Sequence, residues 1–230
     1  MSSNMDLSDM LGNEQVQWPP GGVTFFIPCN CLGDNNFTHD MVRDELRKVF
    51  PAKEEEERIL EDTTYICANA KKIFSILLSG FGDSKEMVRD IRKFVDERIS
   101  DSDLPFIQIP RKEQEPGNYK KINYWLCPND HRKKCLGKHN ENCSIQATAS
   151  WNTRALENFF TTQWKVHVPV FRKIDGDIPH QDFDQNVIMP YVEDFEREAI
   201  IGGFSKVWKV KIHPAHQDLY GSEVIIRSLN

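Results

Sequence analysis

The residues with the clearest chemical potential form a run of cysteines and histidines at four-residue intervals. They are Cys127, His131, Cys135, His139 and Cys143. Thiolate and imidazole groups are preferred zinc ligands, and short spacings let one loop surround an ion. The run has no Cys-x2-Cys pair, however, and its proline, glycine and asparagines disfavour a helix that would align the ligands. Two interpretations stay open: a zinc site, or a solvated basic loop whose cysteines are incidental.

The other cysteines carry weaker signals. Cys29 and Cys31 are separated by one residue, which gives no standard metal clamp. Cys67 falls at an apolar position of a helical pattern, which predicts a core residue. The N-terminus has no basic region followed by an apolar stretch, so no secretory signal is expected. We therefore expect reduced thiols rather than a disulfide framework.

A basic segment precedes and overlaps the cysteine and histidine run. Residues 111–138 have a local net charge of +5, and Tyr119, Tyr124 and Trp125 are interleaved with the lysines. Aromatic and cationic side chains together can bind nucleic acid. The whole chain has a net charge of −6, and residues 175–198 have a local charge of −7. This balance predicts neither a nucleic-acid partner nor binding to an anionic membrane. The basic segment is expected to be a charged surface or to pair with the acidic one.

A glycine-rich segment near the C-terminus offers a second chemistry. Residues 198–212 read as a strand, a tight turn at Gly202 and Gly203, and an alternating strand. The pattern resembles the phosphate-covering loop of protein kinases, G-x-G-x-x-G-x-V. The resemblance implies partial nucleotide-binding roles for five residues: Gly202, Gly203, Phe204, Ser205 and Val207. The match is incomplete, because Ile200 stands at the first glycine position and Ser205 at the third. The alternative is an ordinary β-hairpin.

Five further segments extend this resemblance. They are Ile99–Phe106, Asn158–Trp164, Pro169–Phe171, Ile178–His180 and Ile212–His216. In this order, together with the glycine-rich segment, they resemble the N-terminal portion of a group of large fungal protein-kinase-domain proteins, over roughly residues 40–220. The resemblance implies ATP-dependent serine/threonine phosphorylation with Mg²⁺ as the metal.

The sequence departs from that family where the chemistry would occur. After Ile212 there is no lysine, no V-A-I-K, no H-R-D and no D-F-G, and Arg227 is the only strong base. We therefore expect no catalytic residue, no catalysis by this chain alone, and weak or absent ATP binding. The chain is expected to stop inside the kinase small lobe, after two strands that leave an unpaired edge.

Four segments are expected along the chain, and they predict an α+β fold. Residues 1–37 are expected to be mostly disordered, and residues 38–103 to form a helical bundle. Residues 104–185 are expected to be an irregular α+β linker region, with a helix over 151–162 and a strand over 164–173. Residues 186–230 are expected to be a truncated, antiparallel kinase N-lobe.

Apolar spacing predicts the helices of the bundle. One is expected to begin at Thr38 as N-cap, one to run from about Lys53 to Leu78, and one to begin at Ser84. The long helix has an apolar stripe that includes Ile59, Ile66 and Ile73, which Leu60 should widen.

The bundle supports a second functional hypothesis, a non-catalytic interaction or regulatory module with a protein partner. No apolar run is long enough to span a membrane, so no membrane partner is expected. The absence of targeting signals makes the cytoplasm the expected location.

Overall fold

The structure, a computed structural model, has an α+β fold. It describes residues 6–18, 21–80, 85–110, 124–128, 144–194, 200–201, 205–219 and 223–229. The chain divides into two compact units. One, here called the helical unit, comprises Met1–Gly12 and Asp34–Gln163, and the other, the sheet unit, comprises Asn13–Gly33 and Trp164–Asn230. These limits differ from those of the four segments expected from the sequence. No helix within the described ranges is long and apolar enough to cross a membrane.

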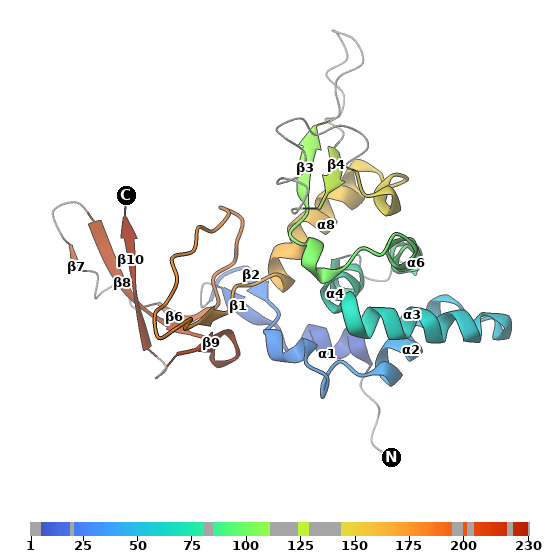
Figure 1. The fold of residues 1–230 in the computed structure, drawn as a ribbon, viewed down its shortest axis with the longest axis horizontal. Helices are drawn as coiled ribbons and strands as arrows, with labels where there is room; N and C mark the ends of the chain where they lie inside the picture. The colour runs from blue at the N-terminus through green and yellow to red at the C-terminus, as the bar shows by residue number, and fades with distance from the viewer. Residues whose placement is uncertain are drawn as a thin grey trace, which may run out of the picture. The chain divides into compact units, whose positions relative to one another are not determined.

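In its described residues, the helical unit has short helices and a two-stranded ribbon, β3 with β4 (Figure 1). Its helices are α1 (Leu7–Asn13), α2 (His39–Val49), α3 (Glu56–Asn69), α4 (Lys71–Gly80), α5 (Lys85–Arg89), α6 (Ile91–Asp96) and α8 (Thr153–Val166), with 3-10 turns η2 (Lys53–Glu55), η3 (Asp101–Asp103) and η5 (Gln146–Thr148). The ribbon is antiparallel and joins β3 (Ile107–Pro110) to β4 (Tyr124–Cys127). Ser84, the expected N-cap of the third helix, lies outside the described residues. The helix expected after it is divided into α5 and α6, with the break at Asp90.

Amphipathic spacing accounts for the core of this unit. Ile59 and Ile66 of α3 and Ile73 of α4 are buried, as the apolar stripe predicts. Thr38 caps α2 as predicted, because its hydroxyl accepts a 3.3 Å hydrogen bond from the Met41 backbone N–H. Leu60 was expected on the same buried face, but this prediction is wrong: its side chain is 56% exposed.

The prediction of a single helix from Lys53 to Leu78 is also wrong. The chain forms two helices, and the first ends with Ala70 as its C-cap. Asp101 explains why the second helix begins there. Its carboxylate accepts hydrogen bonds from the backbone N–H groups of Lys72 (3.0 Å) and Ile73 (3.1 Å). A cap supplied from 29 residues away cannot be seen in local spacing.

The N-terminal segment is more ordered than expected. Residues 1–37 were predicted to be mostly disordered, yet the structure has α1, the hairpin of β1 (Val16–Trp18) with β2 (Thr24–Phe26), and the 3-10 turn η1 (Cys29–Leu32). Leu7 and Leu11 of α1 are buried, and the Ser8 N–H donates to Glu45 of α2. Helix α1 therefore gains its order from tertiary contacts rather than from helix propensity.

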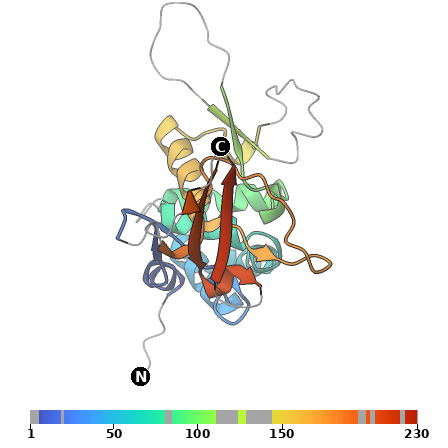
Figure 2. The ribbon, with the colours of Figure 1, turned by 90° about the vertical axis from the view of Figure 1, so that its left-hand side faces the viewer.

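The sheet unit is built around one antiparallel sheet. It contains β6 (Tyr191–Asp194), β7 (Ile200–Ile201), β8 (Ser205–Ile212) and β10 (Glu223–Leu229), with β8 in the centre. Figure 2 shows β8 and β10 side by side. A parallel pair of β5 (Phe171–Arg172) with β9 (Gln217–Asp218) and the 3-10 turn η7 (Pro214–His216) complete the unit. Phe171 packs with Val210 and Ile212 in its core.

Strand β10 pairs with an edge of β8 that was expected to be free. It pairs with β8 over seven residues, from Glu223 opposite Lys211 to Leu229 opposite Ser205. The prediction that the chain contributes only two strands and leaves β8 with a free edge is therefore wrong. The apolar run Val224-Ile-Ile226 has the β-branched composition that favours a strand.

The strand expected over residues 164–173 is mostly helix and loop. Helix α8 continues to Val166, and β5 retains only Phe171 and Arg172. The alternating valines suggested a longer strand, but Pro169 has no N–H to donate to a sheet. The last turn of α8 instead meets the residue that follows β2, where the Ile27 N–H donates to the Lys165 carbonyl at 2.8 Å.

Candidate functional site

The residues on either side of the glycine-rich segment form paired strands, as expected. Ile200 and Ile201 of β7 pair antiparallel with Val207 and Lys206 of β8. Three of the predicted loop residues, Gly202, Gly203 and Phe204, lie outside the described residues. Ile201 of β7 and Lys206 of β8, on either side of that segment, are opposite each other.

The remaining two loop positions belong to β8. Ser205 is opposite Leu229 of β10, and Val207 is opposite both Ile200 and Arg227. Val207 thus occupies the middle of a three-strand register. Arg227 is the basic residue that the third strand places beside it, and β10 contains no lysine. The structure therefore brings together the two strands of the predicted loop and a third strand that sequence reasoning missed.

The proposed zinc ligands fall almost entirely outside the described residues. Only Cys127 is described, at the end of β4, where it is fully buried opposite Ile107. His131, Cys135, His139 and Cys143 are not described, nor is Tyr119 of the basic segment. Within the described ranges, no group of three or more potential ligands is close enough to hold a metal ion. The zinc interpretation stays a prediction.

The other cysteine pair lies in a hydrogen-bonded junction of the sheet unit. The Cys29 N–H donates to Nε2 of His216 at 3.0 Å, and the Cys29 thiol donates to the Ala215 carbonyl at 2.7 Å. Nδ1 of His216 lies 2.9 Å from the Pro169 carbonyl oxygen. Because Nε2 accepts, the proton belongs on Nδ1, which donates to Pro169. His216 is therefore a neutral imidazole that joins three segments.

Aromatic packing completes this junction. Phe26 lies edge-on to both His213 and His216, at centroid distances of 5.8 and 5.5 Å. Phe26 and His216 are both completely buried. Burial lowers the pKa of His213 below its usual value. The arrangement favours neutral imidazoles in an apolar setting, which suits a structural role better than proton transfer with solvent.

The thiol of Cys31 is poorly suited to nucleophilic or redox chemistry. Burial raises its pKa to about 11, and the negative charges of Glu14 and Cys29 act in the same direction. A thiolate is the reactive and metal-binding form, and little of it exists near neutral pH at such a pKa. The weak metal or redox signal at Cys29 and Cys31 therefore receives no support from this geometry.

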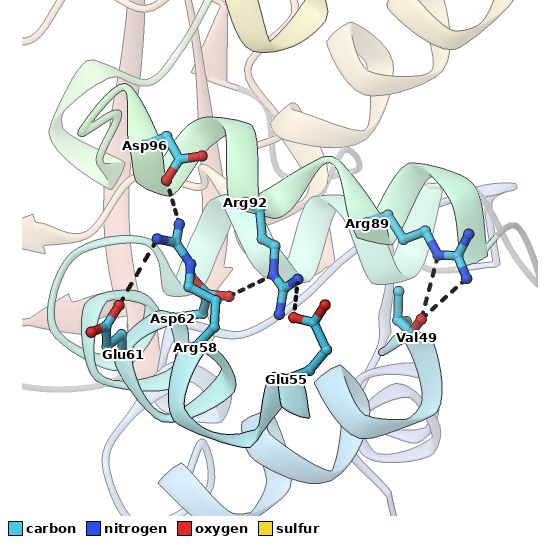
Figure 3. Close-up of polar contacts among 8 residues, drawn as sticks. All are labelled: Val49, Glu55, Arg58, Glu61, Asp62, Arg89, Arg92 and Asp96. Atoms are coloured by element: carbon cyan, nitrogen blue, oxygen red, sulfur yellow. Dashed lines mark hydrogen bonds and ion pairs between the residues drawn. The ribbon is translucent and has the colours of Figure 1, made fainter. Parts of the chain in front are cut away.

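An ion-pair network around one buried carboxylate in the helical unit was not predicted from the sequence (Figure 3). Asp62 of α3 is completely buried, and its Oδ2 accepts a 2.8 Å hydrogen bond from Nε of Arg92 in α6. Nε of Arg58 lies 3.0 Å from Oδ1 of Asp62. Arg92 also donates to Glu55 at 2.7 Å, and Arg58 pairs with Asp96. The network connects α3, α6 and the 3-10 turn η2.

Burial is the largest influence on the pKa of the Asp62 carboxyl, which is raised above its usual value. Burial raises the pKa of Asp62, while the hydrogen bond from Arg92 and the charge of Arg58 oppose the rise. The Arg92 guanidinium carbon lies 3.5 Å from the ring centroid of Phe50, in cation–π contact. A sequence signal did exist, since Asp62 lies between Ile59 and Ile66 on the apolar stripe. Each charge has an opposite partner, so the network is better suited to orienting helices than to binding a ligand.

Comparison with models of protein families, with curated proteins and with solved structures finds no match to this chain. The function must therefore be argued from the chain itself.

Proposed function

We propose that this chain is the N-terminal part of a protein-kinase-domain protein of the fungal group that its sequence resembles. We further propose that these 230 residues do not transfer phosphate. The observation that carries the proposal is the pairing of β7 with β8 on either side of Gly202 and Gly203. An antiparallel pair around a turn of small residues is the setting in which a kinase loop covers nucleotide phosphates.

The third strand supports the second half of the proposal. In a kinase this strand carries the lysine that binds the α- and β-phosphates. Here β10 reads Glu-Val-Ile-Ile-Arg-Ser-Leu, with Arg227 as its single base. Arginine does not replace lysine readily, because its planar guanidinium has a different shape and hydration. The aspartates of H-R-D and D-F-G are absent from the sequence, so neither a base nor a magnesium ligand is expected.

A thermal-shift measurement with ATP and Mg²⁺ tests whether the loop retains a nucleotide site. A ligand that binds the folded state must raise the melting temperature by mass action. We expect no rise at millimolar ATP and no autophosphorylation. A rise that Gly203→Val abolishes, or phosphate incorporated into the chain, would contradict the inactive assignment.

The family assignment has a separate test in the gene. The genomic DNA downstream of the codon for Asn230 should encode, in frame or after an intron, a lysine-bearing strand, H-R-D and D-F-G. A downstream region with none of these motifs in any frame would refute the assignment, whatever the nucleotide measurement shows.

A second candidate is a non-catalytic interaction module, and the outer face of α3 favours it. Leu60 is 56% exposed there, between the acidic residues Glu56, Glu57 and Glu61. Glu56 pairs with Arg47 and Glu61 with Arg58, so the leucine stands among charges of both signs. An exposed leucine in such a setting suits a partner with an apolar spot and a polar surround. A specific partner that co-purifies with the wild-type chain should be lost with Leu60→Arg. It should be retained with Val23→Ala, a control at a fully exposed apolar residue. Retention of the partner by Leu60→Arg would argue against this surface.

A further inference from the structure

Helix α1 is a short element that depends on the surface beneath it. It has seven residues, well below the roughly 12–15 that an isolated helix needs to be even marginally stable in water. Leu7–Gly12 belongs to the helical unit, whereas the chain that follows, Asn13–Gly33, belongs to the sheet unit. Helix α1 is therefore a segment that can open locally while the rest of the helical unit stays folded.

Three apolar side chains anchor α1 on the helical unit. Leu7, Met10 and Leu11 occupy positions i, i+3 and i+4, which share one face of a helix, and all three are buried. Ser8 and Asp9, which lie between them in the sequence, are exposed. Because this face is buried within the unit, the detachment of α1 would uncover an apolar surface of matching shape.

Polar contacts fix the direction of α1 on α2, which lies beside it in Figure 1. Asp6 caps the start of α1, because its Oδ1 accepts a 2.7 Å hydrogen bond from the Asp9 N–H. The other carboxylate oxygen of Asp6 lies 2.7 Å from Nζ of Lys48. Glu45, almost one turn earlier on α2, accepts a 3.3 Å hydrogen bond from the Ser8 N–H. One carboxylate of α2 thus receives the first turn of α1, and one ammonium receives its capping acid.

The α2 side of this contact has the groups that recognise the start of a helix. Glu45 is buried, and Lys48 donates to it at 3.1 Å in addition to pairing with Asp6. This hydrogen bond from Lys48 lowers the pKa of the Asp6 carboxyl below its usual value. The detachment of α1 would remove a donor from a buried carboxylate, which is unfavourable, and an acid from Lys48. Another helix with an acid at its N-cap would restore both contacts, since every helix has free N–H groups at its start.

We propose that the surface of α2 beneath α1 is a docking site for an amphipathic helix of a partner protein, with α1 as its internal competitor. The partner helix would have an acidic N-cap and apolar residues at its first, fourth and fifth positions, as α1 does. Anchors at this spacing are typical of a helix that binds in a groove. A second copy of the chain is a weaker occupant, because its α1 has the same contacts without the advantage of the tether, an effective concentration of about millimolar order.

Hydrogen exchange of the full chain tests whether α1 detaches. The Met10 N–H, which donates to the Asp6 carbonyl at 3.0 Å, should exchange at least about tenfold faster than amides in the middle of α2. Added salt should increase this difference, since the pair of Asp6 with Lys48 is partly exposed. Equal exchange of the two helices would show that α1 opens only when the whole unit unfolds, and would overturn the proposal.

A fluorescent, N-acetylated peptide with the sequence of residues 6–14 serves as the probe for the docking site. The full chain with Leu7→Asp and Leu11→Asp has a weakened α1, so it should bind the peptide at least about tenfold more tightly than the wild-type chain. Lys48→Glu in this variant should weaken binding by about tenfold, and a peptide with Asp6→Lys should recover part of the loss. Fluorescence anisotropy measures each affinity.

Matched controls separate docking from folding and from general charge. Lys53→Glu, at an exposed lysine of the same unit, and a peptide with Ser8→Ala, which keeps the backbone N–H, should leave binding unchanged. Melting temperatures are compared throughout, and Leu11→Ala replaces the double variant where that variant fails to fold.

Three results of the binding measurements would overturn the proposal. The first is no binding of the peptide to the chain with a weakened α1. The second is an equal effect of Lys48→Glu and Lys53→Glu on that binding. The third is a dimer of the wild-type chain, seen by sedimentation, that Leu7→Asp with Leu11→Asp abolishes, because it would assign the surface to a second copy.

Discussion

Gly80 at the end of α4 lies directly against Thr162 of α8. A Cβ atom on the glycine would stand 2.9 Å from the threonine Oγ1 and 3.3 Å from its Cβ. Contacts between real Cβ atoms and their neighbours are not that short, so the two helices pack here at a distance that only glycine permits. Gly80 is the last residue of α4.

Replacement of this glycine should therefore destabilise the helical unit. We expect Gly80→Ala to lower the free energy of unfolding by about 1–3 kcal/mol through overpacking, despite the better helix propensity of alanine. Thr162→Ala in the same chain should recover part of the loss by removing the closest atom. Gly12→Ala in α1 is the matched control, because nothing lies within 4 Å of its added Cβ. Urea unfolding measures all three, and equal effects at Gly12 and Gly80 would contradict the close packing.

Gln163 should be as important as an apolar core residue. Its side chain is completely buried, its Oε1 accepts a 2.7 Å hydrogen bond from the Phe106 N–H, and its Nε2 donates to the Phe106 carbonyl at 2.9 Å. Gln163→Leu leaves both backbone groups buried without partners, so we expect a loss of about 2–4 kcal/mol in the free energy of unfolding. The exposed neighbour Thr161→Ala should change it by less than about 0.5 kcal/mol. Similar small losses for both variants would show that water replaces the amide.

Removal of Arg92 alone should destabilise the helical unit, because it leaves the buried carboxylate of Asp62 without its closest donor. Arg92→Met removes the donor to Oδ2, and we expect a cost of about 3–5 kcal/mol in the free energy of unfolding. The double variant Asp62→Leu with Arg92→Met should recover most of that cost, since no charge is left buried and unpaired. Arg47→Met, which breaks the exposed pair with Glu56, is the control and should leave the unfolding midpoint nearly unchanged. A double variant no more stable than Arg92→Met would contradict this account.

Acid should weaken the sheet unit through His213. Burial lowers the pKa of its imidazole in the folded chain, so the unfolded chain binds protons more readily. The resulting stability is present above the usual pKa of about 6.5 and is lost as the pH falls below it. His213→Asn keeps an acceptor for the Ala215 N–H and should flatten the loss between roughly pH 7 and 5. Hydrogen exchange of residues 164–219 measures this loss of stability as a function of pH. His180→Asn, at an exposed histidine, should keep the wild-type dependence on pH.

Alkali should act on the same unit through Cys31. The pKa of its thiol is raised from 9.0 to about 11 in the folded chain, so the folded state holds its proton longer than the unfolded one. The stability this provides is complete below pH 9 and is lost as the pH rises through 11. Cys31→Ala should therefore show a smaller loss over that range than the wild-type chain. In addition, iodoacetamide at pH 8 should leave Cys31 unmodified in the folded chain, and rapid labelling would contradict its burial.

Local spacing was sufficient for some elements because their determinants are close in sequence. The N-cap and apolar stripe of α2 lie within one segment, and its hydroxyl cap is confirmed. Helix α8 was expected over 151–162 and is present over Thr153–Val166. Both helices bury a face that repeats every three to four residues, which is the signal that sequence reasoning uses.

Other elements depend on residues far apart in the chain. The break after Asn69 requires Asp101, and the order of α1 requires Glu45 of α2. Similarly, the Cys29 N–H finds its acceptor in His216, 187 positions away. For the candidate loop, the two flanking strands were predictable from a turn signal, whereas the pairing of β10 with β8 was not, because local spacing does not say which strand a third strand will join. Long-range partners leave no periodic trace in the sequence.

The two-unit division also bears on how the chain is made. The chain leaves the helical unit at residue 12, returns at residue 34, and leaves again at residue 164. Phe26 of β2 therefore leaves the ribosome 187 residues before His213, against which it packs (213 − 26 = 187), a delay of roughly 9–37 s at ordinary rates of synthesis. During that interval Phe26 and Ile27 have no core to enter, while the helices of the other unit are still being completed. The N-terminal hairpin is thus the part of the nascent chain that a chaperone would protect for longest.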